Sequence, residues 1–295
     1  MRESAHIASR PTLLPLALTG GVLCFLLLLV PMGTPTRVID AVVHFDVSVF
    51  AFFSRFAGRS WTVDTLIWSV WTQAAVQGGV VMVLVWGAWF SQGETPESRQ
   101  TRAAMLSSLV GVYACILLTL VLRVVLPFRA RPMVDPTSAF QMPYLPNGAM
   151  PTAESTSFPS GHAAVLFALA IGLWSISRTL GIVAGFHGLF VVCLPRVYFG
   201  RHWATDIVAG AGVALATVPM VNEVLRRSSL VPRLLGWSER RPAAFYSVFF
   251  LCSMDIAMDF AFVKTALKLV SILQLVRGVH ITRVVMWIVT GTAPA

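Results

Sequence analysis

The 295-residue chain is 56% hydrophobic and only 12% charged, and its mean hydropathy of +0.76 lies far above that of soluble domains. Apolar runs of about 18 to 25 residues recur, each long enough to cross a bilayer of about 30 Å. We therefore expect an all-α, polytopic membrane protein built as one helix bundle. The net charge of +9 comes from basic residues that lie mostly between the apolar runs, so it indicates membrane headgroups and topology and not nucleic acid.

The first third of the chain predicts one anchor, one surface helix and one span. The apolar run 13–30 is interpreted as a signal anchor with a cytoplasmic N-terminus. Residues 36–59 mix apolar and charged side chains, which favours an interfacial amphipathic helix. In it His44 and Asp46 are two apart, so they face apart on a helix and are expected to fill the core or the interface. A second span is expected over 66–89, because tryptophans near both ends fit the two aromatic belts of a membrane.

The remaining helices follow a polar loop at 91–102. A third span is expected over 103–126, and after a Pro-rich loop at 127–159 we expect helices over 161–177, 180–194 and 203–224. These segments complete six core transmembrane helices in one bundle over residues 1–225. Residues 226–295 are expected to form a basic linker and a hydrophobic or amphipathic extension, with a candidate seventh span at 243–263 and an amphipathic segment at 264–292.

Three polar clusters fall on one face of this topology. With the N-terminus inside, the ends of the third and fifth spans and the starts of the fourth and sixth helices all lie outside. Clusters at 123–132, 157–162 and 196–206 are then brought together on the non-cytoplasmic face of an inner or plasma membrane. Arginines at 226–241, placed inside, agree with that orientation. Such a meeting of polar clusters is what an active site requires.

The third cluster pairs a histidine with a carboxylate. His202 and Asp206 are four residues apart, so on a helix Asp206 can orient the imidazole of His202 and fix its tautomer. Arg196 lies six residues upstream of His202. A His–Asp couple beside arginines suits a nucleophile aimed at phosphorus. The alternative is a membrane-interface cluster of Arg, His, Trp and Tyr.

The middle cluster starts a helix. Ser160 is expected to be the N-cap after Pro159, which leaves free N–H groups and the positive end of the helix to bind an anion. Gly161 allows close approach and His162 lies in the first turn. The alternative is an ordinary helix start.

The first cluster supplies guanidinium groups. Arg123, Arg129 and Arg131 can bind phosphate oxygens in a bidentate manner. Each of them alone is better explained as an arginine that faces the headgroups.

Taken together, the clusters resemble the signature of the type-2 phosphatidic acid phosphatase family, membrane lipid phosphatases that include bacterial undecaprenyl-diphosphate phosphatases. The family pattern is Lys-x6-Arg-Pro, then Pro-Ser-Gly-His, then Ser-Arg-x5-His-x3-Asp. Residues 159–162 match the second motif, and Arg196, His202 and Asp206 keep the spacing of the third, in which Pro195 replaces Ser.

The first motif departs further from that pattern. Arg131 and Pro132 are present, but the upstream basic residue, Arg123, is not a lysine and stands one position too far away. Arg123 and Arg129 both remain candidates for the lysine's role.

The resemblance implies a mechanism that needs no metal or cofactor. His202 would attack phosphorus to form a phosphohistidine while Asp206 holds its ring, and His162 would protonate the leaving oxygen and then activate water. The residues that it implies for binding the phosphate oxygens are Arg123, Arg131, Arg196, Ser160 and Gly161. The implied partners are a membrane lipid phosphate or diphosphate and the bilayer.

Two other functions remain open on the sequence alone. The same site could pass the phosphoryl group to a non-water acceptor as a lipid-linked phosphotransferase, or the chain could bind lipid without catalysis. The substrate lipid and the oligomeric state also stay open.

Three further patterns carry expectations. Asp255 and Asp259 are costly in an apolar segment, so they should face the bundle or a wet cavity, either as a structural network or for a function outside the phosphatase chemistry. Small residues every four positions predict close packing between the helix over 161–177 and that over 203–224; these residues are Ala164, Ala168, Gly172, Gly210 and Ala214. The four cysteines are isolated, so neither a disulfide nor a zinc site is expected.

Overall fold

The computed structural model describes residues 15, 18–22, 37–91, 93, 95–146, 155–263 and 265–266. These residues form helices and no strand, which confirms the all-α fold. Of the expected anchor at 13–30 only residues 15 and 18–22 are described. The expected amphipathic segment at 264–292 lies outside the described residues except for 265–266, and residues 147–154 of the Pro-rich loop lie outside them too. In chain order the elements are α2 (Arg37–Ser54), α3 (Trp61–Thr72), the π-helix η1 (Ala75–Gly79), α4 (Val80–Phe90), α5 (Pro96–Val125), the 3-10 helix η2 (Pro132–Val134), α6 (Gly161–Trp174), α7 (Arg178–Phe186), the π-helix η4 (His187–Cys193), α8 (Leu194–Tyr198), α9 (Ala204–Arg226), α10 (Leu230–Arg240) and α11 (Pro242–Ala257).

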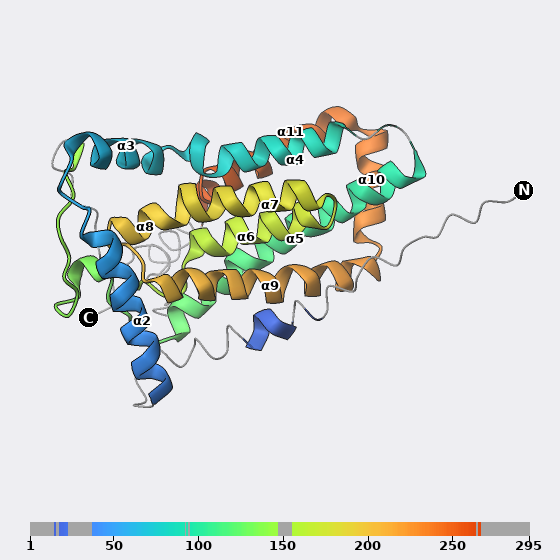
Figure 1. Cartoon of the computed structure of the whole chain (residues 1–295). Coiled ribbons are helices and arrows are strands. Elements are labelled where there is room, and N and C mark those ends of the chain that lie inside the picture. The colour runs from blue at the N-terminus through green and yellow to red at the C-terminus, as the bar shows by residue number, and fades with distance from the viewer. Residues whose placement is uncertain are drawn as a thin grey trace, which may run out of the picture.

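Four helices form the centre of the molecule. α5, α6, α7 and α9 run side by side in Figure 1; α5 packs against α6 and α9, and α6 also packs against α7 and α9. Small side chains lie where they cross, and Ala164, Ala168 and Ala214 are completely buried. The predicted close packing of these helices is therefore confirmed.

The apolar helices indicate an integral membrane protein. Among the described residues three helices are long and apolar enough to cross a bilayer, Pro96–Val125, Arg178–Tyr198 and Ala204–Arg226, and they contain the expected third, fifth and sixth spans. α6 and α11 are apolar but have only 14 and 16 residues, and 14 residues rise only about 21 Å. The expected total of six core spans stays a prediction.

The expected second span is not one straight helix. Trp61–Thr72 and Ala75–Phe90 meet at an angle of 67°, so the prediction of a continuous span over 66–89 is wrong. The chain is extended at Gln73 (ψ 109°), and the π-helix η1 follows at once. Gly78 lies so close to the end of α11 that an added Cβ would come within 2.7 Å of the Ala257 Cα. The end of α11 therefore packs directly against this segment, a contact that sequence periodicity does not encode.

Two loop predictions also change. α5 begins at Pro96, inside the expected polar loop 91–102, because Thr95 and Ser98 form a capping box there. The expected basic linker at 226–241 contains helix α10, which crosses the end of the bundle opposite α2 (Figure 1).

The C-terminal extension packs on the bundle. α11 runs beside α4 and η1, and Phe245 and Phe249 share one hydrophobic core with Trp89. Trp86 Nε1 donates a hydrogen bond to Ser253 Oγ at 3.0 Å. The division into units at residue 225 stays a prediction, but α10 and α11 bury apolar surface against the rest. Of the cysteines, Cys115, Cys193 and Cys252 are free thiols, and Cys24 lies outside the described residues.

Candidate active site

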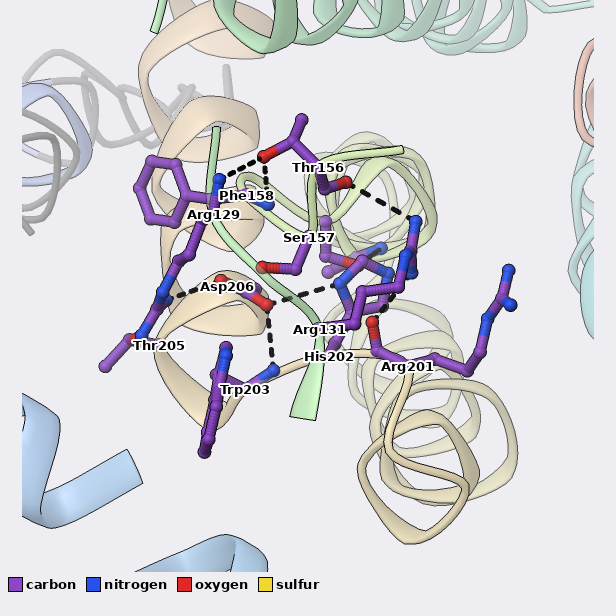
Figure 2. Close-up of polar contacts among 12 residues, drawn as sticks. Arg129, Arg131, Thr156, Ser157, Phe158, Arg201, His202, Trp203, Thr205 and Asp206 are labelled. Atoms are coloured by element: carbon purple, nitrogen blue, oxygen red, sulfur yellow. Dashed lines mark hydrogen bonds and ion pairs between the residues drawn. The ribbon is translucent and has the colours of Figure 1, made fainter. Parts of the chain in front are cut away.

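Hydrogen bonds join the three polar clusters at one end of the bundle. Arg131 Nη1 of the first cluster donates to the Arg201 carbonyl of the third at 2.7 Å. The Ser160 N–H of the second cluster donates to the Asp206 carbonyl of the third at 3.0 Å. Trp203 Nε1 donates to the Ala130 carbonyl at 2.9 Å. Figure 2 shows these segments gathered around Asp206. The expected meeting of the clusters is therefore present in the structure.

His202 is held by Asp206 as its spacing predicts. His202 Nδ1 lies 3.4 Å from Asp206 Oδ2, and the same carboxylate oxygen accepts the Trp203 N–H at 2.8 Å, at the start of α9. Because Asp206 occupies Nδ1, Nε2 is the nitrogen left for chemistry. His202 is only 5% exposed. Burial lowers the pKa of His202 to about 4, against the opposing effect of Asp206, so the ring is neutral at neutral pH.

Arg129 is an ion-pair partner of two buried carboxylates. Its Nη1 lies 2.6 Å from Asp206 Oδ1 and its Nη2 lies 2.5 Å from Asp46 Oδ2, with Asp206 0% and Asp46 1% exposed (Figure 2 shows the Asp206 contact). Burial acts to lower the pKa of Arg129, but the two carboxylates outweigh it and raise that pKa. The charge of Arg129 is therefore neutralised within the protein. Arg123 differs in this respect, since no ion pair of its side chain is seen among the described residues.

Asp46 is buried as expected, but it does more than fill the core. Besides Arg129 it accepts the Thr205 N–H at 2.9 Å and the Thr205 hydroxyl, which fixes the first turn of α9 beside Asp206. Its spacing from His44 gave no sign of this, because its partners lie more than eighty residues away. A carboxylate in an apolar helix was the available signal.

Arg123 and Arg131 hold the segment that leads into Pro159-Ser160-Gly161-His162. Arg123 Nη2 donates to the Thr156 carbonyl at 2.9 Å, and Arg131 Nε donates to the Ser155 carbonyl at 3.0 Å. Arg123 Nε is buried and has no hydrogen-bond partner among the described residues. Burial, together with the neighbouring Arg201 and Arg123, lowers the pKa of Arg131 to about 9. An anion bound here would accept a hydrogen bond from Arg123 Nε and would reduce the repulsion between the arginine side chains.

Arg196 is held by a residue that the sequence analysis missed. Its guanidinium is buried, donates to the Val192 carbonyl at 2.6 Å and to Gln77 Oε1 at 2.6 Å, and lies 5.9 Å from the centroid of the Trp71 ring. Gln77 belongs to η1, at the break in the expected second span. The sequence feature that could have indicated this contact with Arg196 is a polar glutamine, Gln77, within an otherwise apolar run.

The helix start at α6 has the predicted cap. Ser160 Oγ accepts the Ala163 N–H at 3.4 Å, and Ser160 is completely buried. The N–H of Gly161, in the first turn, has no partner within the helix. An added Cβ on Gly161 would come no closer than 3.8 Å to Ile116 Cδ1, so packing alone does not require glycine there.

The two C-terminal carboxylates have different surroundings. Asp255 accepts the Phe262 N–H at 2.8 Å and the Tyr113 hydroxyl at 3.4 Å, so it belongs to a structural network. Asp259 Oδ2 instead lies 3.5 Å from His162 Nε2. Neither alternative considered from the sequence foresaw that Asp259 lies beside His162 of the middle cluster, and the role of Asp259 stays a prediction.

Within the described ranges no group of three or more His, Cys, Asp or Glu residues is arranged to hold a metal ion.

Comparison with known proteins assigns the class. Residues 103–228 match the family model of the PAP2 superfamily, a range that contains all three clusters, and this match confirms the resemblance to type-2 phosphatidic acid phosphatases. Proteins of this superfamily include lipid phosphatases and phosphotransferases. Over 79 residues the chain is 39% identical to lipid A 1-diphosphate synthase of Escherichia coli (strain K12), a match that covers 25% of this chain and 32% of the relative. No solved structure matches the chain significantly.

Proposed function

We propose that the protein is an integral-membrane phosphatase that hydrolyses a lipid phosphate or diphosphate through a phosphohistidine on His202. The observation that carries the proposal is the neutral, buried His202, held at Nδ1 by Asp206 at the same end of the bundle as arginine side chains. A neutral imidazole nitrogen is a nucleophile, whereas a protonated one is not.

The first half-reaction forms the covalent intermediate. His202 Nε2 attacks phosphorus, the bond from phosphorus to the lipid-side oxygen breaks, and His162 gives that oxygen a proton. Asp206 stabilises the positive charge that develops on the His202 ring. Arg123, Arg131 and Arg196, with the Gly161 N–H, neutralise the equatorial oxygens.

The second half-reaction regenerates the enzyme. His162, now neutral, takes a proton from water, the water oxygen attacks phosphorus, and the bond to His202 Nε2 breaks to release inorganic phosphate. Ser160 stabilises the start of α6, where His162 lies, because its hydroxyl caps that helix. The chemistry as proposed uses no metal and no cofactor.

A lipid-linked phosphotransferase is the second candidate. The observation in its favour is the 39% identity to a relative whose name describes the synthesis of a lipid diphosphate. In that reaction a lipid acceptor would replace water in the second half, with the same residues in the first.

We place the site on the non-cytoplasmic face of an inner or plasma membrane, where it meets its lipid substrate in the bilayer. The span count and the arginines at 226–241 support this side.

Phosphate transfer from a panel of lipids tests the proposal. Purified protein in detergent micelles is given polyprenyl diphosphate, phosphatidic acid or phosphatidylglycerol phosphate, with and without lipid A as acceptor. We expect inorganic phosphate to be released from at least one donor without acceptor, and His202→Ala to abolish the release. His44→Ala, at an exposed histidine, is the matched control.

Two results decide between the candidates. If lipid A becomes phosphorylated and no inorganic phosphate is released when lipid A is left out, the protein is a phosphotransferase and not a hydrolase. A folded wild-type protein that neither releases nor transfers phosphate would overturn both functions.

A further inference from the structure

Asp259 reaches the candidate site from outside the segment that matches the superfamily. Its Oδ2 lies 3.5 Å from His162 Nε2, and both side chains are partly exposed, at 38% and 31%. The matched range ends at residue 228, so this carboxylate is a contribution of the C-terminal extension.

Asp259 lies in a tight turn with an unusual backbone conformation, directly after α11. Asp259 and Phe260 follow the end of α11 with positive φ values of 55° and 58°, a conformation that costs non-glycine residues of order 1 kcal/mol or more and persists only where the surroundings enforce it. The Phe260 N–H donates to the Asp255 carbonyl at 2.7 Å, and Phe260, 1% exposed, packs edge-on against Tyr113.

The Asp255 side chain locks the same turn. Its carboxylate accepts the N–H groups of Phe262 and Val263, at 2.8 and 3.4 Å, and the hydroxyl of Tyr113 on α5. One carboxylate thus fixes the turn to the bundle, and the other is presented to His162.

We propose that Asp259 is a positioning residue for His162: its carboxylate holds Nε2 of the imidazole and stabilises the imidazolium, whose Nδ1 then gives its proton to the leaving lipid oxygen. The inference rests on the proposed function. His162 itself lies in the first turn of α6, where the helix N-terminus disfavours a cation. The charged and titratable groups of the site add to this effect, since arginines outnumber carboxylates: Arg123, Arg129, Arg131, Arg196, Arg201, His202, Asp206 and Asp259. Arg129 is already neutralised by Asp46 and Asp206, so Asp259 is the carboxylate placed to offset the remaining positive charge at His162.

The leaving group gives the sharpest test. A lipid alkoxide needs a proton to leave, whereas an aryl oxide needs little, so a defect in the acid shows with one substrate and not with the other. Asp259→Asn should lower kcat on the lipid substrate roughly 10- to 100-fold and on an aryl phosphate by no more than about threefold. Asp259→Glu should restore most of the loss, and Asp40→Asn, at an exposed aspartate on α2, is the control.

Two further readouts separate positioning from a structural role. The basic limb of the kcat profile should move to lower pH in Asp259→Asn, because the imidazolium has lost its counter-charge. The double variant His162→Ala/Asp259→Asn should be no slower than His162→Ala alone, because the two groups act as one unit. Melting temperatures check the fold: Asp255→Asn should be clearly less stable, whereas Asp259→Asn should melt near the wild type.

The contrary results are distinct. Equal losses on both substrates, or losses that multiply with those of His162→Ala, would overturn the positioning role. Higher activity together with tighter inhibition by inorganic phosphate would overturn it too, and would make Asp259 a competitor for the anion site. An active wild type with an unaffected Asp259→Asn variant would remove this inference alone, whereas a wild type inactive on every donor would remove it together with the proposed function.

Discussion

At the residue scale, Asp206 is the group on which the site is built. Its two carboxylate oxygens serve His202, the Trp203 N–H and Arg129, and its carbonyl accepts the Ser160 N–H. A buried carboxylate is tolerated because both of its oxygens, which burial strips of water, find donors. The same carboxyl and carbonyl groups therefore position His202 and join α9 to the start of α6.

Alanine variants of Arg123 and Arg129, the two candidate arginines of the first motif, should have different defects, one in activity and the other in stability. Arg129→Ala leaves two buried carboxylates without their partner, and breaking a buried ion pair costs about 3–5 kcal/mol, so this variant should melt at a clearly lower temperature. Arg123→Ala should lose less thermal stability than Arg129→Ala, because it breaks hydrogen bonds but no buried ion pair, and should lose roughly 100-fold or more in kcat/KM, since it removes a proposed phosphate ligand. Thermal melting and phosphate release on both variants check this, and the reverse assignment of the two defects would contradict it.

The buried neutral His202 should make stability depend on pH. Its pKa is about 4 in the folded protein and 6.5 for the ordinary group, so between those values the unfolded chain binds a proton that the folded protein does not. The stability contributed by neutral His202 is complete above pH 6.5 and is lost as the pH falls toward 4, by roughly 2 kcal/mol between pH 6.5 and pH 5.

The matching measurement is the melting temperature from pH 7 to pH 5. His202→Gln should flatten the decline seen in the wild type, whereas His44→Gln, at an exposed position, should not. An equal decline in His202→Gln and the wild type would show that His202 is not the group that titrates.

At the element scale, the contact between α6 and α9 sets the distance between the two histidines. Gly210 on α9 lies so close to α6 that an added Cβ would come within 2.5 Å of the Ser160 carbonyl oxygen and 3.0 Å of the Ala164 N. No side chain fits there without moving the helix that starts with the anion-binding turn. The glycine is thus required by close approach of two backbones.

Gly210→Leu should therefore wedge the two helices apart. Overpacking costs about 1–3 kcal/mol, and displacement of His202 relative to His162 should lower kcat by at least roughly tenfold. Gly87→Leu on α4 is the control, because a Cβ there meets nothing within 4 Å. Normal activity together with normal thermal stability of Gly210→Leu would contradict this packing.

Local rules predicted those parts of the structure that depend on local sequence. The Ser160 cap, the start of α9 after His202, and the His202–Asp206 pair all follow from neighbours within four residues. Other features join segments that lie far apart in the sequence: the Asp46–Arg129 pair, the contact of Asp259 with His162, and the packing of α11 against Gly78 next to the broken span. Periodicity and spacing carry no information about such contacts, which explains why the supporting residues were missed while the central pair was found.

At the scale of the whole molecule, the arrangement places the polar clusters at one end of an apolar bundle and the basic helix α10 at the other (Figure 1). If α10 faces the cytoplasm, as the positive-inside rule favours, the candidate site faces the opposite side. Substrate would then be taken from the outer leaflet.

Labelling of single cysteines tests that orientation. In a cysteine-free background, Met142→Cys, 50% exposed in the loop between η2 and α6, should react with a membrane-impermeant maleimide in intact cells. Arg227→Cys, with a side chain 75% exposed before α10, should react only after the membrane is opened. The opposite pattern would invert the proposed topology.

The central claim is that His202 is the nucleophile, and trapping of the phosphoryl-enzyme tests it most directly. Protein is mixed with substrate carrying radiolabelled phosphate, quenched within the first turnover and assayed for label that is stable in base and lost in acid. We predict such label on the wild type, with and without chelator, and none on His202→Ala. Label that persists on His202→Ala, or its loss on adding chelator, would contradict the mechanism.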